Sequence, residues 1–301
     1  MIGSRRDLAR LITQIENNHP SARSALAALY PNTGRARLVG VTGAPGTGKS
    51  TLVSEMAKAY RGLNQTVAII AVDPTSPFTG GAILGDRIRM RDLAGDEGVF
   101  IRSMATRGNL GGLARATADV TLALDAAGFD VILIETVGAG QAEVDIAQLA
   151  HTTLVVEAPG LGDDVQAIKA GILEIADVLV VNKADQPGAA DAVRALRGML
   201  GLAHGRTEWN VPICETVAVE GKGVDELLQA IDQHRSYLNA SGELDGRKRA
   251  NVKRHVEMLL QEQLMARFLQ AQNGGSKLDE AVESVVSRAN DPYSVVEELL
   301  K

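Results

Sequence analysis

The sequence predicts an α/β fold, with a mostly parallel sheet flanked by helices, an N-terminal helical preface and a C-terminal helical arm. Three observations support this prediction. Short β-branched runs alternate with amphipathic stretches, the runs are almost continuously apolar, and the last part of the chain keeps only helical periodicity. Continuously apolar strands are typical of parallel sheets covered by helices on both faces. We therefore expect an N-terminal extension over residues 1–34, a central domain over 35–240 and an arm over 241–301.

The N-terminal extension carries apolar residues at helical spacing between Ser4 and Tyr30. Pro20 should divide this stretch into two short helices, because proline is not tolerated inside a helix. The periodic positions are Leu8, Leu11, Ile12, Ile15, Leu26 and Leu29.

Six apolar runs in the central domain predict the strands of the sheet. Amphipathic stretches between the runs are expected to form the helices that connect parallel strands. The six runs are Leu38–Val41, Val67–Val72, Val99–Met104, Val131–Ile134, Leu154–Val156 and Val178–Val181.

The C-terminal arm begins after Ser241-Gly242, where the pattern becomes helical throughout. Gly274-Gly275 should end the first helix before two shorter ones. The arm is too small for a large core of its own, so its apolar stripe should pack on the central domain or on a second copy of the chain. The stripe consists of Val252, Val256, Leu259, Leu260, Leu264 and Phe268.

Composition narrows the classes of function. The chain has 301 residues, 45% of them hydrophobic, and a formal net charge of -6, which argues against a main role in binding nucleic acid. Cys214 is the single cysteine, which excludes an internal disulfide and a four-thiolate zinc site. No apolar run approaches the length of a membrane span, and residues 1–9 lack the apolar core of a secretory signal. We expect a cytoplasmic protein with no membrane partner.

A phosphate-binding loop is the strongest motif. Residues 43–50 read Gly-Ala-Pro-Gly-Thr-Gly-Lys-Ser, which fits G-x-x-x-x-G-K-[ST], and they stand between an apolar strand and a helix. This context predicts a P-loop NTPase fold rather than an ordinary glycine-rich turn. Backbone amides would surround the phosphates, Lys49 would reach the outer phosphates and Ser50 would offer its hydroxyl to Mg²⁺. The expected nucleotide-binding residues here are Gly43, Ala44, Gly46, Thr47, Gly48, Lys49, Ser50 and Thr51.

A second motif selects the base. Asn182-Lys183-Ala184-Asp185 matches N-K-x-D and follows the run Val178–Val181, so it lies where parallel sheets bind ligands. An ionised Asp185 can accept hydrogen bonds from guanine N1–H and its exocyclic amine, whereas adenine offers no such pair of donors. Lys183 would lie along the base, and Asn182 would join the segment to the phosphate loop. Val217, Ala218 and Val219 are expected to place a backbone amide against guanine O6.

Magnesium requires hard oxygen ligands, which carboxylates at strand ends supply. Glu135 closes one run and starts Glu135-Thr136-Val137-Gly138, a variant of D-x-x-G in which the Gly138 amide would contact the γ-phosphate. Asp73 closes another run, and Asp86 lies in a glycine-rich loop. Each carboxylate alone could equally cap a loop or remain solvated, but together they predict a metal site with Ser50.

The sequence lacks one residue that many GTPases use for hydrolysis. No glutamine follows Gly138, where many GTPases carry the residue that positions water, and Gln141 comes later. We expect slow hydrolysis, accelerated by a partner or by an arginine such as Arg87 or Arg89, although either arginine could instead form a structural ion pair. The candidate catalytic residues are Lys49, Glu135, Gly138 and Arg89.

Several further motifs, in this order, make the chain resemble the MeaB/ArgK family of GTPases along nearly its whole length. These motifs are Asp73-Pro74-Thr75-Ser76-Pro77, Leu84-Gly85-Asp86-Arg87-Ile88-Arg89-Met90, residues 100–108, Glu135-Thr136-Val137-Gly138 and Pro159-Gly160-Leu161-Gly162-Asp163-Asp164. Residues 103–112 are explained equally well as a tight strand-to-helix connection.

The resemblance implies a chaperone of an adenosylcobalamin-dependent acyl-CoA mutase, methylmalonyl-CoA mutase among them, which gates cofactor loading and protects the mutase. It implies a homodimer built through the arm and a third switch over Pro159–Lys169. It also implies that Ser50, Asp73, Asp86 and Glu135 surround Mg²⁺. No D-x-H-x-x-G cobalamin motif occurs, so cobalamin should be held by the partner.

Two residues in the segment that follows Glu135-Thr136, which the resemblance makes the second switch, depart from the family pattern. Ala139 stands where valine is usual and Ala142 where serine is usual, and these small changes concern the tuning of this switch rather than activity.

Three rival functions remain. A metal-insertion GTPase of the nickel-accessory kind would need imidazole or thiolate ligands, and here the histidines and Cys214 are scattered. A kinase or transport-associated ATPase would prefer ATP, which Asp185 opposes. A nucleotide-binding protein without hydrolysis is the third.

Overall fold

The computed structural model forms two compact units, residues 1–251 and 252–301. The structure describes residues 4–73, 91–93, 95–105, 112–136, 141–160, 174–202, 208–271 and 274–300.

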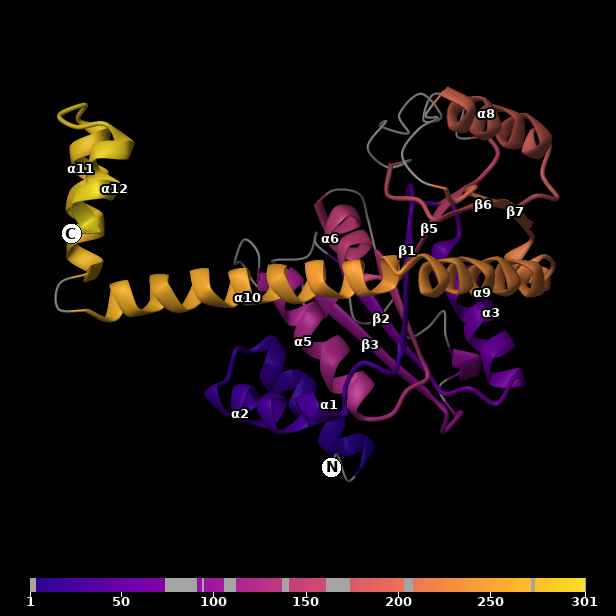
Figure 1. Ribbon diagram of the computed structural model, residues 1–301, viewed down its shortest axis with the longest axis horizontal. Coiled ribbons are helices and arrows are strands. Elements are labelled where there is room, and N and C mark those ends of the chain that lie inside the picture. The colour runs from indigo at the N-terminus through magenta and orange to yellow at the C-terminus, as the bar shows by residue number, and fades with distance from the viewer. Residues whose placement is uncertain are drawn as a thin grey trace. The chain divides into compact units, whose positions relative to one another are not determined.

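A seven-stranded, fully parallel sheet forms the centre of the first unit, with strand order β3-β2-β4-β1-β5-β6-β7 (Figure 1). Its strands are β1 (Arg37–Thr42), β2 (Val67–Asp73), β3 (Val99–Ala105), β4 (Val131–Thr136), β5 (Thr152–Glu157), β6 (Val178–Asn182) and β7 (Ile213–Thr216). The strand β1 is central, and it pairs with β4 on one side and β5 on the other. The predicted parallel α/β fold is therefore confirmed.

The six predicted strands are all present, and β4, β5 and β6 are buried along their whole length. The seventh strand, β7, was not predicted. It has four residues, pairs only with β6 and is only partly buried, with Glu215 exposed. A short edge strand needs no continuous apolar run, so the pattern that predicts central strands does not reveal it.

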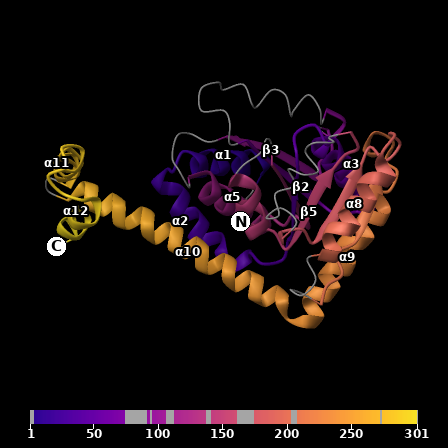
Figure 2. The same cartoon turned by 90° about the horizontal axis from the view of Figure 1, so that it is seen from above.

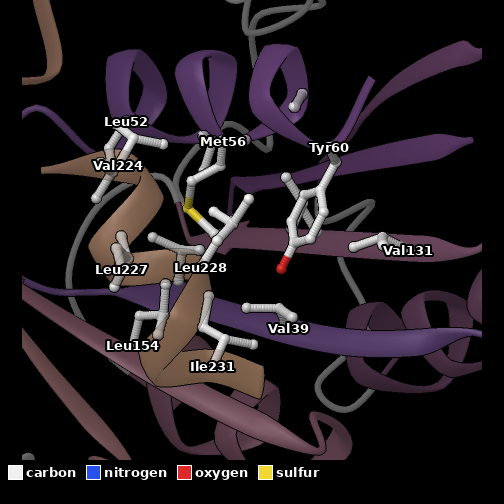
Figure 3. Packing of buried hydrophobic residues seen from close by; sticks show 14 of the residues in the cluster. Val39, Leu52, Met56, Tyr60, Val131, Leu154, Val224, Leu227, Leu228 and Ile231 are labelled. Carbon is white, nitrogen blue, oxygen red and sulfur yellow. The ribbon is translucent and has the colours of Figure 1, made fainter. Parts of the chain in front are cut away.

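Helices cover both faces of the sheet. On one face lie α3 (Lys49–Gly62) and α9 (Val224–Ser241), and on the other α5 (Gly112–Ala126), α6 (Gln141–Leu149) and α8 (Ala189–Leu202). In Figure 3, Met56 and Tyr60 of α3 face Leu228 and Ile231 of α9 above Val39 of β1. This packing fixes α3, and with it the loop that precedes α3, against the central strand. The described part of the first unit also contains the short 3-10 helices η1 (Tyr30–Asn32), η2 (Arg91–Leu93) and η3 (Ala218–Glu220).

The N-terminal segment forms the two predicted helices, α1 (Arg5–Glu16) and α2 (Pro20–Leu29), with Pro20 in the first turn of α2. Figure 2 shows α1, α2 and α5 lying side by side. The four periodic residues of α1 are buried and join the core over β2 and β4. Glu16 also forms an ion pair with Arg102 of β3. The N-terminal helices are therefore packed into the first unit.

The helix α10 (Glu243–Gln270) begins in the first unit, where its first residues are tied to the sheet. Arg247 donates two hydrogen bonds to the carboxylate of Asp177, which lies just before β6, at 2.7 and 2.8 Å. Asn251 donates to the Leu149 carbonyl at 3.0 Å. These contacts fix the direction in which α10 starts.

The second unit contains the rest of α10, with α11 (Gly274–Val286) and α12 (Pro292–Leu299), as predicted from Gly274-Gly275. The helices α11 and α12 pack on each other, and Val295 is buried. Several residues of the predicted apolar stripe on α10 are exposed in the single chain, among them Val256 and Leu260. Within the described part of the chain, no helix combines the length and the apolar character that crossing a membrane requires.

Candidate nucleotide-binding site

The phosphate loop lies at the carboxyl end of β1 and leads directly into α3. Gly43 has φ 135° and Gly48 has φ 90°, conformations that side chains with a Cβ rarely adopt. A Cβ on Gly43 would lie 2.1 Å from the Val156 carbonyl oxygen, and one on Gly48 would lie 2.5 Å from the side-chain nitrogen of Asn182. The glycines thus allow the loop to pass close to β5 and β6. No side chain caps the start of α3, so its first amides are available to an anion.

Lys49 is buried beneath the loop, and its ammonium group donates to the carbonyls of Gly43 and Ala44 at 2.7 and 2.9 Å. Burial lowers the pKa of Lys49 and outweighs three carboxylates that raise it, those of Glu135, Glu143 and Glu157. The side chain therefore stands among the loop carbonyls, within the concave loop that would hold phosphates.

Ser50 and Glu135 meet next to this loop. The Ser50 hydroxyl donates to Oε1 of Glu135 at 2.5 Å, and Glu135, near the end of β4, is 2% exposed. A hydroxyl and a carboxylate are the hard oxygen ligands that Mg²⁺ prefers, so these two residues fit a magnesium site. Among the described residues, no group of three His, Cys, Asp or Glu side chains could hold a metal.

Asn182 connects the base-recognition motif to the phosphate loop. Its side-chain amide donates to the Thr47 carbonyl at 2.8 Å, and its Oδ1 accepts from the Thr216 hydroxyl and the Ala218 amide, each at 3.1 Å. One buried side chain therefore holds three segments together, at the ends of β1, β6 and β7.

Lys183 and Asp185 continue from Asn182 toward solvent. Lys183 adopts φ 58° and donates from Nζ to the Gly46 carbonyl at 2.8 Å, so its stem lies across the phosphate loop. Asp185 is exposed and makes no hydrogen bond or direct ion pair with the residues that the structure describes. Its carboxylate is thus able to accept from a ligand. Lys222 is a nearby cation.

The segment Val217–Val219 lies beside this motif. Val217 and Ala218 are buried and Val219 is 79% exposed. The Ala218 amide donates to Asn182 Oδ1 at 3.1 Å. The adjoining turn is closed by the Val217 amide, which donates to the Lys222 carbonyl.

Several predicted site residues lie outside the described residues. These are Asp86, Arg87, Arg89 and Gly138, together with residues 161–169 of the predicted third switch. Asp73 ends β2 as expected, but its side chain also lies outside the described part. The described site thus consists of the phosphate loop, Thr51 in the first turn of α3, Glu135 and the base-recognition segments.

Two carboxylates near Lys49 escaped the sequence reasoning. Glu157 is the last residue of β5 and Glu143 lies in α6, and both are buried. Glu157 could have been found by the rule that selected Glu135, since both lie at the ends of strands that surround the loop. Glu143 carried no comparable signal.

Comparisons with known proteins agree with this site. The family model for methylmalonyl-CoA mutase-associated GTPase MeaB matches residues 8–273. A Pyrococcus abyssi protein named as a GTPase is 48% identical over 302 residues, covering 99% of this chain and 93% of that protein. The GTPase ArgK of Escherichia coli is 39% identical over 250 residues, covering 80% of this chain and 76% of that protein.

Among solved structures, a LAO/AO transport system kinase superposes with a TM-score of 0.74 at 28% identity, over 99% of this chain and 93% of that one. This similarity extends over the central sheet and both helical ends. Given the family match over most of the chain, this protein belongs to the MeaB family of methylmalonyl-CoA mutase-associated GTPases.

Proposed function

We propose that this chain binds GTP with Mg²⁺, hydrolyses it slowly, and uses the bound nucleotide to regulate an adenosylcobalamin-dependent acyl-CoA mutase. The observation that carries the nucleotide proposal is the position of Asn182, which joins the phosphate loop to the N-K-x-D segment at 2.8 Å. A triphosphate and a guanine base are the two parts of one ligand, and these two elements lie side by side.

The phosphate loop and Lys49 are assigned to the triphosphate. Backbone amides of residues 43–48 and of the first turn of α3 would bind phosphate oxygens, and the Lys49 ammonium would exchange its two loop carbonyls for the outer phosphates. Because Lys49 is buried, its charge acts in a medium of lower polarity than water and interacts strongly with an anion.

Ser50 and Glu135 are assigned to Mg²⁺, with Asp73 and Asp86 as further ligands suggested by the family pattern. When bound, the ion neutralises charge on the phosphate oxygens. The residues that we propose for catalysis are Lys49, Glu135, Gly138 and Arg89. The family name supports GTP as the nucleotide that is hydrolysed.

Asp185 is assigned to guanine. Its exposed carboxylate only accepts hydrogen bonds, which matches the N1–H and amine donors of guanine. Adenine offers no such pair of donors and would leave the carboxylate unpaired. None of the rival functions gains a specific observation: the imidazoles and Cys214 form no cluster of metal ligands in the described part of the chain.

The partner assignment rests on the family description, which names an association with methylmalonyl-CoA mutase. Cobalamin would be bound by the mutase, and residues 159–169 would report the nucleotide state to it. The exposed stripe on α10 supports a homodimer formed through the arm. The lone, partly buried thiol of Cys214 supports a reducing, cytoplasmic location.

The sharpest test of guanine recognition is the Asp185→Asn variant. Xanthine carries an oxygen in place of the guanine amine, so an amide in place of the carboxylate should pair with xanthine better than with guanine. Calorimetry should show GTP affinity reduced by about 100-fold or more and XTP affinity increased. Asp279→Asn, an exposed change on α11, is the control. Equal affinity of the wild-type protein for ATP and GTP would contradict the proposal.

Association with a mutase is tested separately. The full-length chain should co-purify with an adenosylcobalamin-dependent acyl-CoA mutase, and the amount should differ between GTP and GDP. Lys49→Ala should remove this difference, because the nucleotide would no longer bind tightly. If no complex forms in either nucleotide state, the mutase role fails, while the GTP-binding proposal stands on its own measurement.

A further inference from the structure

A small cavity lies at the amino ends of the inner strands β1 and β5, whereas the phosphate loop follows the carboxyl end of β1. Its volume is about 40 Å³, and it is lined by the segment that leads into β1, the start of β5, α9 and the first turns of α10. All of its lining residues belong to the first unit. The cavity is lined by the first three residues of β1, 37–39, whereas the phosphate loop follows its last residue, Thr42, so the two sites lie toward opposite ends of this strand.

Four cationic side chains line the cavity: Arg35, Arg37, Arg235 and Lys248. Arg37 forms an ion pair with Asp232 at 2.5 Å, and Arg35 donates to the Asn32 carbonyl. By contrast, neither Arg235 nor Lys248 makes a hydrogen bond or direct ion pair within the described ranges of the chain. Two of the four cations therefore have no direct ion-pair partner among the described residues, although Asp232 is near enough to act on Arg235 through its charge.

Asp125, a carboxylate whose charge acts on His151, makes no direct ion pair with Arg235 or Lys248 among the described residues. Asp125 of α5 already accepts hydrogen bonds from the backbone amides of Arg35 and Ala36 at 3.1 and 2.9 Å, and it also accepts from Gly34. Burial and then repulsion from Arg37 lower the pKa of Arg235, against smaller opposite effects of Asp232 and Tyr60. The cavity is thus a positive region in a chain whose net charge is -6.

His151, which also lines the cavity, lies within the field of the same cations. Burial, and then repulsion from Lys248 and Arg235, lowers the pKa of His151 to about 4, against a weaker opposite effect of Asp125. Its ring also accepts a hydrogen bond from the Leu38 amide at 3.3 Å, which requires an unprotonated Nδ1. The ring is therefore neutral at pH 7, and it adds no charge of its own to the cavity.

The apolar wall limits what fits. Val39 and Ile231, which face each other in Figure 3 and are each 1% exposed, line the cavity together with Leu38 and Leu244. A space of this volume accommodates an inorganic oxyanion but no nucleotide base. Arginine guanidinium groups bind such oxyanions through paired N–H donors.

We propose that this cavity is a binding site for a small oxyanion of the phosphate and sulfate class, held by Arg235 and Lys248 with support from Arg37. The ligand would bridge Arg235 of α9 and Lys248 near the start of α10, two cations that make no direct ion pair with the described residues. This site is distinct from the phosphate loop, and the proposal does not depend on GTP binding.

The test uses NMR of the His151 ring, because this ring reports on the cavity and lies at the far end of β1 from the phosphate loop. Sulfate is the probe, since it stays a dianion throughout the titration range, and sodium chloride at equal ionic strength is the reference. A bound dianion should raise the pKa of His151 by about one unit or more in the full-length protein.

Two variants make the result specific. Arg235→Gln combined with Lys248→Gln should abolish the effect of sulfate, and should itself raise the pKa of His151 because two repelling charges are gone. Arg249→Gln removes a neighbouring exposed cation of α10 that does not line the cavity and should leave the sulfate effect unchanged. If the double variant fails to fold, Lys248→Gln alone should weaken sulfate binding by about tenfold.

Calorimetry with inorganic phosphate then tests whether phosphate binds at the same place, since it should displace sulfate from the same residues. The proposal is overturned if sulfate and chloride give the same pKa of His151. It is also overturned if the double variant or Lys248→Gln keeps the full sulfate effect, or if Arg249→Gln loses it.

Discussion

Gly43 shows how one residue determines the path of the phosphate loop. Its φ is positive, and a Cβ at this position would come within 2.1 Å of the Val156 carbonyl oxygen, so there is no room for a side chain. Gly46 has φ 82° but open space around its Cβ position, and it serves as a matched position in the same loop. The sequence motif specifies Gly43 but leaves position 46 open, and only the structure shows that Gly43 touches β5.

We expect Gly43→Ala to lower the free energy of unfolding by about 3 kcal/mol, because the backbone strain and the clash with Val156 act together. Gly46→Ala should cost about 1 kcal/mol, since only its backbone conformation is strained. Urea unfolding of the two variants measures the difference. Equal losses would show that the contact with β5 is not tight in solution.

His151 predicts a pH dependence of stability. Its pKa falls from 6.5 to about 4 on folding, so the unfolded chain binds more protons between these values. The contribution of the neutral ring is fully present above pH 6.5 and is lost as the pH falls toward 4, up to about 3 kcal/mol.

The His151→Asn variant keeps an acceptor for the Leu38 amide but removes this titration. Urea unfolding between pH 4 and 6.5 should show a smaller loss of stability in the variant than in the wild-type protein. Parallel curves for the two proteins would contradict the assigned pKa.

At the scale of elements, β7 and the central strands show where sequence patterns succeed. Strands buried on both faces must be apolar at nearly every position, and β4, β5 and β6 are visible in the sequence for that reason. The strand β7 pairs on one side only and keeps Glu215 exposed, so its pattern resembles that of a loop. Its position nevertheless matters, because Thr216 at its end contacts Asn182.

The start of α10 depends on Asp177, a buried residue outside any motif. Burial opposes its ionisation, but the hydrogen bonds from Arg247 and the His234 ring, whose Nε2 lies 3.3 Å from Oδ1 of Asp177, hold its pKa below the usual range. The Trp209 indole donates to the Asp177 carbonyl at 2.8 Å and packs on the ring of His234. This cluster connects α9 and α10 to the beginning of β6.

We expect Arg247→Met to lower the free energy of unfolding by about 3 kcal/mol, because it leaves the Asp177 carboxylate buried without its arginine partner. The difference from wild type should narrow as the pH falls, since protonation of Asp177 removes the unpaired charge. Chemical unfolding at several pH values measures both effects. Arg249→Met, an exposed change on the same helix, should be nearly neutral, and an equal loss there would rule out the ion pair as the cause.

At the scale of the whole molecule, the chain leaves apolar surface exposed on its second unit. Val256, Leu260 and Leu264 follow one another at four-residue spacing on α10 and are 57%, 55% and 56% exposed. Such a stripe is typical of a helix that packs on a partner. It is the surface on which the proposed homodimer depends.

We expect Val256→Asp combined with Leu260→Asp to convert a dimer to a monomer in sedimentation velocity, because two charges would be buried in an apolar interface. Gln261→Asp, an exposed polar position on the same helix, should leave the dimer intact. Nucleotide affinity should be unchanged in both, since the site lies in the first unit. A wild-type monomer at micromolar concentration would refute the dimer.

The sequence by itself determined the parallel α/β class, six of the seven strands, the helical ends and the phosphate and N-K-x-D motifs, because each depends on local periodicity or on residues that are close along the chain. Only the tertiary structure decided the strand order, the link from Asn182 to Thr47, the carboxylates around Lys49 and the cationic cavity at the start of β1. These features join segments that are distant in sequence, and their meeting depends on which strands pair, which no local pattern encodes.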